Sequence, residues 1–240
     1  MNKQNIIIIG ATSGIGRALF EKYATSSNRI GIVARRTHLL DELLQEHPDT
    51  TVTAAADITK QDEIARAIDV LRAELKYIDL VIVCSGTGDI NATLDYAVER
   101  PTIDTNITGW TFVIDTLYHI FEQQGHGHLV AITSAGGLRG EPMAPAYSAS
   151  KAYQINYMEA LRKKAYKSGN HIHVTEIRPG LVDTAMAKGE GLFWVMPVKK
   201  VASQIITAIR KQKSKAYVTK RWHVLAIINK NLPYSIYKKM

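Results

Sequence analysis

Three side chains in the stretch "AITSAGGLRGEPMAPAYSASKAY" have the types and spacing needed to move a proton to or from an oxygen atom. Tyr147 and Lys151 are four residues apart, so on a helix they share a face, and the ammonium group is expected to lower the pKa of the phenol from its usual value of about 10. Ser134 lies thirteen residues before Tyr147, at the end of a predicted strand, where its hydroxyl can hold a carbonyl oxygen beside the phenol. Tyr234 and Lys238 repeat the spacing without such surroundings, so Ser134 distinguishes the first pair.

A second chemical feature is the glycine-rich stretch "IIIIGATSGIGRALF", residues 6–20. An apolar run, a turn with Gly10, Gly14 and Gly16, and a resumed alternation of apolar and polar residues predict a strand, a tight turn and a helix. The first N–H groups of such a helix point outward, and its partial positive charge favours a phosphate. The stretch therefore predicts a nucleotide site, although the same spacing also fits an ordinary turn.

The elements that must position these residues alternate along the chain. Apolar runs predict strands at residues 6–9, 30–34, 52–56, 80–84, 129–133, 174–177 and 216–219, and helix-like stretches include residues 102–124 and 148–167. This order predicts an α/β fold: a single doubly wound, Rossmann-like domain with a parallel seven-stranded sheet and helices on both faces. Ligands of such sheets bind beyond the carboxyl ends of the strands, where Gly10, Asp57, Gly86 and Ser134 fall.

The residues after the second predicted strand indicate which nucleotide is preferred. A fold that binds NAD commonly has an acid there, about 20 residues after the glycines, to bind the ribose 2′-hydroxyl. Here the position is Ala34, followed by Arg35 and Arg36, whose guanidinium groups can hold a 2′-phosphate. We therefore expect NADP(H), with Arg35 as the main contact and Arg17 and Arg36 as weaker candidates. Asp57 is expected either to accept a hydrogen bond from adenine or to cap a helix.

Composition limits the remaining classes of function. With 240 residues, 46% of them hydrophobic, the chain can bury one core, and its net charge of +8 suits an anionic partner. Nucleic acid is not expected, because only "KRWHVL" interleaves basic and aromatic residues. Because the sequence has no signal-like or membrane-spanning run, we expect the protein in the cytoplasm.

The cysteine and histidine residues indicate neither a disulfide nor a metal site. Cys84 is the only cysteine and is expected to be a small buried hydrophobic residue. The residues of each pair, His126/His128 and His171/His173, are two apart and could face the same way on a strand. Because neither pair has an acidic or cysteine partner, we expect solvated turns and no metal.

Considered together, the motifs from about residue 6 to residue 184 resemble the short-chain dehydrogenase/reductase family. The resemblance rests on the three glycines, Asn106 in "TIDTNITG", the serine, tyrosine and lysine named above, and "RPGLVDT" at residues 178–184, in the family's order and approximate spacing.

The resemblance implies an NADP-preferring oxidoreductase with four catalytic residues. Ser134 would orient the substrate, Tyr147 would be the general acid/base, Lys151 would tune the pKa of Tyr147 and bind ribose, and Asn106 would hold a proton-relay water. The implied cofactor contacts are Gly10, Thr12, Ser13, Gly14, Ile15, Gly16, Arg35, Arg36, Asp57, Ile58, Ser85, Gly86, Tyr147, Lys151, Pro179, Gly180, Val182 and Thr184.

Two positions depart from the family's pattern. Where the family has Asn-Asn-Ala-Gly after the fourth strand, this chain has Val-Cys-Ser-Gly at residues 83–86, which changes the side chains that support the centre of the sheet. Many NADP-preferring members have a basic residue before the second motif glycine, whereas this chain has Ser13.

Two C-terminal segments are expected to decide substrate and partners. Residues 185–198 occupy the place of the family's variable substrate lid, so a lipophilic ketone or aldehyde is expected, unless the segment packs on the core or on a second subunit. Its proposed hinges and apolar wall are Gly189, Gly191, Met186, Leu192, Phe193, Trp194 and Met196. We predict a catalytic domain over residues 1–219 and a basic amphipathic segment over residues 220–240, which either packs over the pocket or a partner subunit or contacts an anionic membrane.

These features favour an NADPH-dependent carbonyl reductase. The resemblance implies a homodimer or homotetramer, with the helices at residues 102–124 and 148–167 as the interface. The alternative is an NADP(H)-binding sensor without turnover, which would need the glycines and Arg35 but not the proton-transfer residues.

Overall fold

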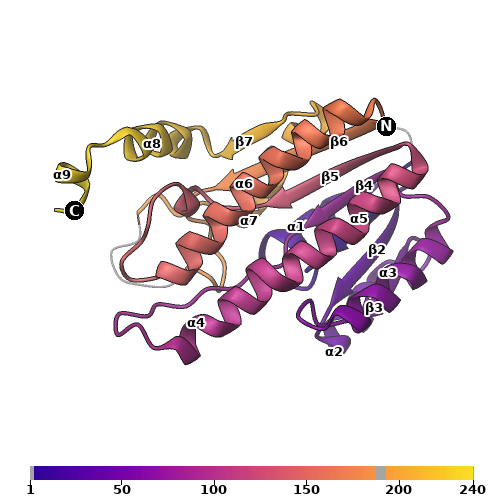
Figure 1. The fold of residues 1–240 in the computed structure, drawn as a ribbon. Coiled ribbons are helices and arrows are strands. Elements are labelled where there is room, and N and C mark those ends of the chain that lie inside the picture. Colours follow the sequence, from indigo (N-terminus) through magenta and orange to yellow (C-terminus); the bar gives the residue numbers. More distant parts are fainter. Residues whose placement is uncertain (1–2, 188–192, 240) are drawn as a thin grey trace.

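A parallel sheet of seven strands organises the protein in this computed structural model, which describes residues 3–187 and 193–239 (Figure 1). The strands are β1 (Asn5–Ile9), β2 (Arg29–Ala34), β3 (Thr51–Ala55), β4 (Leu80–Val83), β5 (His126–Ile132), β6 (His171–Pro179) and β7 (Lys215–Val218). Their order in the sheet is β3-β2-β1-β4-β5-β6-β7, so the winding direction reverses between β1 and β4. The doubly wound α/β fold predicted from the sequence is confirmed.

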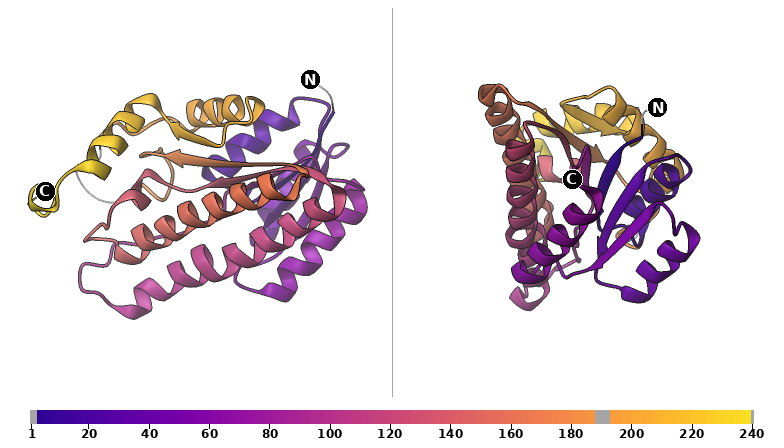
Figure 2. Two further views of the ribbon diagram at one scale, coloured as in Figure 1. Left: turned by 45° about the horizontal axis from the view of Figure 1, so that its top comes forward. Right: turned by 90° about the vertical axis from the view of Figure 1, so that its right-hand side faces the viewer.

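Helices cover both faces of this sheet (Figure 2). One face is covered by α3 (Gln61–Leu75), α5 (Trp110–Gln124) and α6 (Pro145–Ser168), and the other by α1 (Gly14–Ala24), α2 (Thr37–Glu46) and α7 (Val198–Arg210). The remaining helical segments are α4 (Tyr96–Ile103), the π-helix η1 (Asp104–Gly109), the 3-10 turn η2 (Ala135–Leu138), α8 (Lys220–Asn231) and α9 (Tyr234–Tyr237). The predicted division at residue 219 falls between β7 and α8, and as a division into functional parts it stays a prediction.

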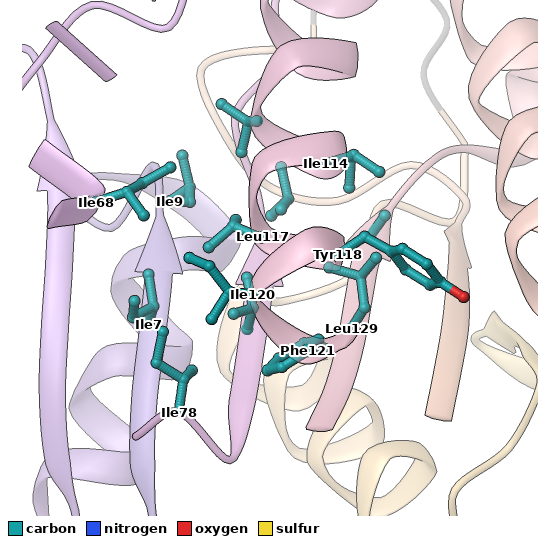
Figure 3. Close-up of a cluster of buried hydrophobic side chains, with 14 of the residues drawn as sticks. Ile7, Ile9, Ile68, Ile78, Ile114, Leu117, Tyr118, Ile120, Phe121 and Leu129 are labelled. Atoms are coloured by element: carbon teal, nitrogen blue, oxygen red, sulfur yellow. The ribbon is translucent and has the colours of Figure 1, made fainter. Parts of the chain in front are cut away.

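A buried cluster fills the space between the sheet and the helices α3, α5 and α6 (Figure 3). Ile114, Leu117, Tyr118 and Phe121 recur at helical spacing on α5 and are almost completely buried against the strands. This packing fixes α5, and with it the π-helix η1 that precedes it.

The helix predicted at residues 102–124 begins earlier and is not regular. It starts at Tyr96 because Asp95 caps it: the Asp95 carboxylate accepts a hydrogen bond from the Ala97 N–H at 2.8 Å. It widens into η1 over residues 104–109, which contains Asn106. Single-turn π segments are frequent at functional sites.

The prediction that the four histidines lie in solvated turns is wrong. His126 and His128 begin β5, His171 and His173 begin β6, and the two pairs face each other in register. Backbone hydrogen bonds extend these strands beyond their apolar runs, because ladder pairing depends on N–H and C=O groups rather than on side chains. His128 is buried, and its Nε2 lies 2.7 Å from the Thr175 hydroxyl.

Candidate active site

The glycine turn after β1 has a backbone that larger residues would distort. Gly10 and Gly14 have φ angles of +87° and +53°, in the left-handed region that favours glycine. A Cβ atom on Gly16 would lie 2.1 Å from the Gly10 carbonyl oxygen, so this position tolerates only glycine. The helix α1 therefore begins within this turn, at Gly14.

The N-terminus of α1 faces outward with basic residues around it. The hydroxyl of Ser13, the N-cap residue, accepts a hydrogen bond from Arg36 Nη2 at 2.9 Å, and Arg36 also donates to the Thr12 hydroxyl at 2.9 Å. The free N–H groups of the first helical turn and this guanidinium fit a phosphate group. The residues present thus fit the phosphates of a nicotinamide dinucleotide.

The three arginines considered for the coenzyme differ in their partners. Arg36 lies on the glycine turn, whereas Arg35 is mainly exposed and lies 3.5 Å from a carboxylate oxygen of Asp57. Arg17 pairs with Glu21 and Glu46 at 3.0 and 2.8 Å, on the flank of α1. Arg36, which sequence analysis ranked below Arg35, is therefore the arginine that contacts the turn.

Asp57 does not cap α3, because the N-cap residue of α3 is Lys60. Its carboxylate accepts hydrogen bonds from the N–H and the hydroxyl of Thr59, both at 2.9 Å. Burial alone would raise the pKa of Asp57, but these bonds and the nearby Arg35 outweigh it and hold the pKa below its usual value. The helix-cap interpretation is wrong, and the adenine contact stays a prediction.

The serine, tyrosine and lysine come together at the carboxyl ends of β4 and β5. Ser134 follows β5, and Tyr147 and Lys151 lie one turn apart on α6. Tyr147 is within hydrogen-bonding reach of Ser134, and Lys151 Nζ lies 5.9 Å from the centre of the Tyr147 ring. The Ser134 hydroxyl also accepts a hydrogen bond from the Gly136 N–H at 3.0 Å, which fixes its position.

The pKa of Tyr147 moves opposite to the sequence-based expectation. Burial raises it, and the hydrogen bond with Ser134 offsets only part of that effect. Lys151 is itself buried, which lowers its pKa to about 8. At neutral pH the Tyr147 phenol is therefore protonated, and Lys151 carries its positive charge in most molecules.

Gln154 links Lys151 to Asn106, and sequence analysis missed it. Its side chain is fully buried on α6, where Oε1 accepts a hydrogen bond from Lys151 Nζ at 2.9 Å and Nε2 donates to the Asn106 carbonyl oxygen at 2.9 Å. The signal was a polar residue three positions after Lys151, on the same face of a helix. The relay water expected at Asn106 stays a prediction.

The Asn106 side chain is held by the loop after β4. Its Oδ1 accepts from the Thr87 N–H at 2.9 Å, and its Nδ2 donates to the Thr87 carbonyl oxygen at 2.7 Å and to the Ser150 hydroxyl at 3.0 Å. A Cβ atom on Gly86 would lie 3.3 Å from Lys151 Nζ and 3.4 Å from Asn106 Oδ1. The loop after β4 therefore lies directly against the lysine.

The family's second asparagine is replaced by Cys84 without opening the sheet. Cys84 is half-buried and packs against the cluster that α1 and α7 cover, and burial raises the pKa of its thiol to about 12. The next residue, Ser85, contacts the turn: a Cβ atom on Gly10 would lie 2.8 Å from the Ser85 hydroxyl oxygen.

The segment after β6 returns to the glycine turn. A Cβ atom on Gly14 would lie 3.2 Å from Thr184 Cγ2. Val182 is buried and forms a bridge with Met196, so the chain just before the predicted lid pairs with the C-terminal part of the lid. Phe193 and Trp194 are about half exposed and contact each other edge to face. Of the predicted hinges and wall residues, Gly189, Gly191 and Leu192 lie outside the described residues.

The C-terminal arm, residues 220–239, lies against this segment, as in the first of the two arrangements expected from the sequence. Trp222 covers Gly180, where a Cβ atom would lie 2.0 Å from its ring, and stacks on Phe193 with ring centres 5.5 Å apart. Arg139 of the loop after Ser134 donates to the Leu232 carbonyl oxygen, and its guanidinium lies 4.5 Å from the Tyr237 ring centre.

Two general findings concern metals and membranes. No group of three or more His, Cys, Asp or Glu side chains within residues 3–187 and 193–239 is arranged to hold a metal ion. In the same ranges, every helix is too short or too polar to cross a membrane.

Comparison with known proteins agrees with this geometry. A family model described as short chain dehydrogenase matches residues 4–192. An uncharacterized oxidoreductase of Mycobacterium tuberculosis is 32% identical over 228 residues, which cover 91% of this chain and 89% of that protein. A short-chain dehydrogenase/reductase from Burkholderia phymatum in complex with NAD has a TM-score of 0.85 at 16% identity, covering 95% of this chain and 93% of that one.

An actinorhodin polyketide ketoreductase variant with NADPH has a TM-score of 0.79 at 22% identity, covering 90% of this chain and 95% of that one. The structural neighbours thus include complexes with both coenzymes, and they share the fold of this chain. The glycine turn, the family model and the oxidoreductase relative agree: this chain is an oxidoreductase that belongs to the short-chain dehydrogenase family.

Proposed function

We propose that this protein is an NADPH-dependent carbonyl reductase in which Tyr147 is the general acid. The observation that carries the proposal is the convergence of Ser134, Tyr147 and Lys151 at the carboxyl edge of the sheet, next to the loop after β4. A binding protein without turnover has no need for this arrangement. The bound coenzyme would supply the hydride, and the residues of the chain would supply alignment and the proton.

The proton would come from the Tyr147 phenol. Because burial raises its pKa, the phenol stays protonated at neutral pH and can donate to the oxygen of a carbonyl group. The Ser134 hydroxyl would hold that oxygen beside the phenol. Lys151, with a pKa of about 8, would stabilise the phenolate that remains, because its charged ammonium group lies 5.9 Å from the centre of the ring.

NADP(H) is the coenzyme that we propose. Ala34 ends β2 where a carboxylate would repel a 2′-phosphate, and Arg35 and Arg36 follow it. The position of Arg36 on the glycine turn supports a contact with the 2′-phosphate, and Arg35 adds a second cation at the edge of the site.

The proposed substrate is a lipophilic ketone or aldehyde. Met186, Phe193 and Trp194 present apolar surface after β6, at the edge of the sheet where the proton donor lies. We also propose a homodimer or homotetramer formed through α5 and α6. Tyr153 and Tyr157, partly buried on α6, pack against Trp110 of α5 and would continue into such an interface.

The experiment that tests this function is coenzyme consumption with a panel of aliphatic, steroid and aromatic carbonyl compounds. The proposal predicts turnover with at least one lipophilic class, and faster turnover with NADPH than with NADH. If NADPH binds tightly but no carbonyl compound in the panel is reduced, the sensor hypothesis replaces the enzyme. Faster turnover with NADH would contradict the role given to Arg35 and Arg36.

A further inference from the structure

We propose that the C-terminal arm and the loops beside it bind the surface of an anionic lipid membrane. The first observation is charge. The sequence after Glu190 contains no Asp or Glu as far as residue 240, and it contains eleven cationic residues. Five of them lie on the arm: Lys220, Arg221, Lys230, Lys238 and Lys239. The other six lie on α7, at the start of β7 or between them: Lys199, Lys200, Arg210, Lys211, Lys213 and Lys215.

The second observation is the distribution of exposed apolar side chains. In the described part of the chain, fifteen large hydrophobic residues are exposed, and eight of them follow residue 185: Met186, Phe193, Trp194, Val224, Ile227, Ile228, Tyr234 and Ile236. Four more lie between β4 and α4, at the start of α4 and before α6: Ile90, Leu94, Tyr96 and Met143. These segments and the arm lie at the same end of the molecule, on the left in Figure 1.

The helix α8 has one face on the protein and one face in solvent. Trp222 and Ala226 face the body of the protein, where Trp222 covers the backbone at Gly180. Val224, Ile227 and Ile228 are three and four residues apart, so they form a stripe on the other face, and their exposed fractions are 58%, 49% and 54%.

Cations stand at both ends of this stripe. Arg221 lies three residues before Val224 and Lys230 three residues after Ile227, and both are exposed. An apolar stripe bordered by long basic side chains is the pattern of a helix that lies in the headgroup region of a membrane, where the cations reach anionic lipid.

The arm is held so that this stripe faces outward. The Tyr237 hydroxyl donates to the Gly140 carbonyl oxygen, and Arg139 binds the Leu232 carbonyl oxygen and packs on the Tyr237 ring. These contacts fasten the C-terminal end of α8 and the end of α9 to the loop that follows Ser134. The docking expected from the sequence is therefore present on one face, and the other face remains available to a partner.

Charge decides between a membrane and a second copy of the chain. In a symmetric contact, the stripe of one copy would meet the same stripe of the other, which would bring Arg221 and Lys230 of both copies together without acids on the arm to balance them. An anionic bilayer instead attracts each of these cations. Because none of the described helices can cross a membrane, the contact is peripheral.

Sedimentation of the full-length protein with vesicles tests the proposal. The vesicles are phosphatidylcholine alone, or phosphatidylcholine with about a third phosphatidylserine, at low and at high salt. We expect binding to the anionic vesicles only, weakened by salt. The triple variant Val224→Ser/Ile227→Ser/Ile228→Ser should lose about tenfold or more of the binding, because the stripe no longer enters the headgroup region.

The matched control removes three exposed apolar side chains elsewhere, in the variant Val70→Ser/Tyr77→Ser/Tyr166→Ser. This control should bind vesicles as the unchanged protein does. Neutralising both flanking cations, in Arg221→Gln/Lys230→Gln, should weaken binding by about fivefold per cation without changing the fold, as checked by circular dichroism.

Two results would overturn the proposal. One is equal sedimentation with neutral and anionic vesicles, or none with either. The other is a change of molecular mass in solution for the triple variant at unchanged vesicle binding, which would show that the stripe contacts a second copy. None of these readouts measures turnover, so the membrane proposal and the proposed reductase activity are tested independently of each other.

Discussion

Replacing Gln154 by a glutamate tests whether the charge on Lys151 supports proton transfer at Tyr147. Lys151 Nζ lies 2.9 Å from Gln154 Oε1, and burial holds the lysine pKa at about 8. A carboxylate at that distance favours the charged ammonium and raises its pKa by about 1 to 3 units. The basic limb of the pH profile should therefore move upward by at least about one unit.

The size of the effect follows from the fraction of charged lysine. One pH unit above a pKa of about 8, only about a tenth of the Lys151 side chains keep their proton, so at pH 9 the unchanged protein should retain about a tenth of its kcat/KM at pH 7. With the pKa raised by one unit or more, the Gln154→Glu variant should retain about half or more.

The assay is kcat/KM for carbonyl reduction with NADPH from pH 6 to pH 10, normalised within each variant. Normalisation removes any uniform loss that arises because the introduced carboxylate, unlike the Gln154 amide, cannot donate to the Asn106 carbonyl oxygen. Gln154→Met, which removes the acceptor without adding charge, is the control and should not move the limb upward. If the profiles of Gln154→Glu and the unchanged protein superimpose, the charge on Lys151 does not limit the reaction and the reasoning is refuted.

Three further predictions concern the coenzyme, the histidines and the glycine turn. Arg36→Ala should weaken NADPH binding by about tenfold or more and leave NADH binding nearly unchanged, and Ala34→Asp should shift preference toward NADH. Both affinities are measured by fluorescence titration. Equal losses of affinity for the two coenzymes would contradict the contact between Arg36 and the 2′-phosphate. Burial and the neighbouring His173 lower the pKa of His128 to about 4, so the folded state binds fewer protons than the unfolded state between pH 6.5 and 4, and stability falls as pH falls through this window. From pH 7 to pH 5 the loss is about 2 kcal/mol, and urea unfolding of His128→Gln should show a correspondingly smaller loss than the unchanged protein. Gly16→Ala should lower Tm and abolish coenzyme binding, because its Cβ atom would meet the Gly10 carbonyl oxygen at 2.1 Å; a variant that binds as before would show that the turn is not the phosphate site.

The sheet was predictable from the sequence because buried parallel strands are continuous apolar runs. The runs beginning at Ile6, Ile30 and Leu80 place β1, β2 and β4 within a residue or two of their observed bounds. The early starts of β5 and β6 were not predictable, because His126 and His171 carry no apolar signal and are placed by ladder pairing alone.

The site was predictable as far as its residues are marked by spacing within one helix or by position at a strand end. Ser134, Tyr147 and Lys151 are of this kind. The sign of the Tyr147 pKa shift was not predictable, because it depends on burial, which spacing does not report. The same limit applies to Arg36 and to Arg139, whose contacts join segments that are far apart in the sequence.

The measurement that most directly tests the central claim is the rate of NADPH-dependent carbonyl reduction by Tyr147→Phe. The change removes the hydroxyl and keeps the ring, so fold and coenzyme binding should persist while the rate falls by about 10² or more. Tyr234→Phe, on the exposed end of the chain and also four residues before a lysine, is the matched control and should keep full activity. Activity of Tyr147→Phe close to that of the unchanged protein would contradict the proposal that this phenol donates the proton.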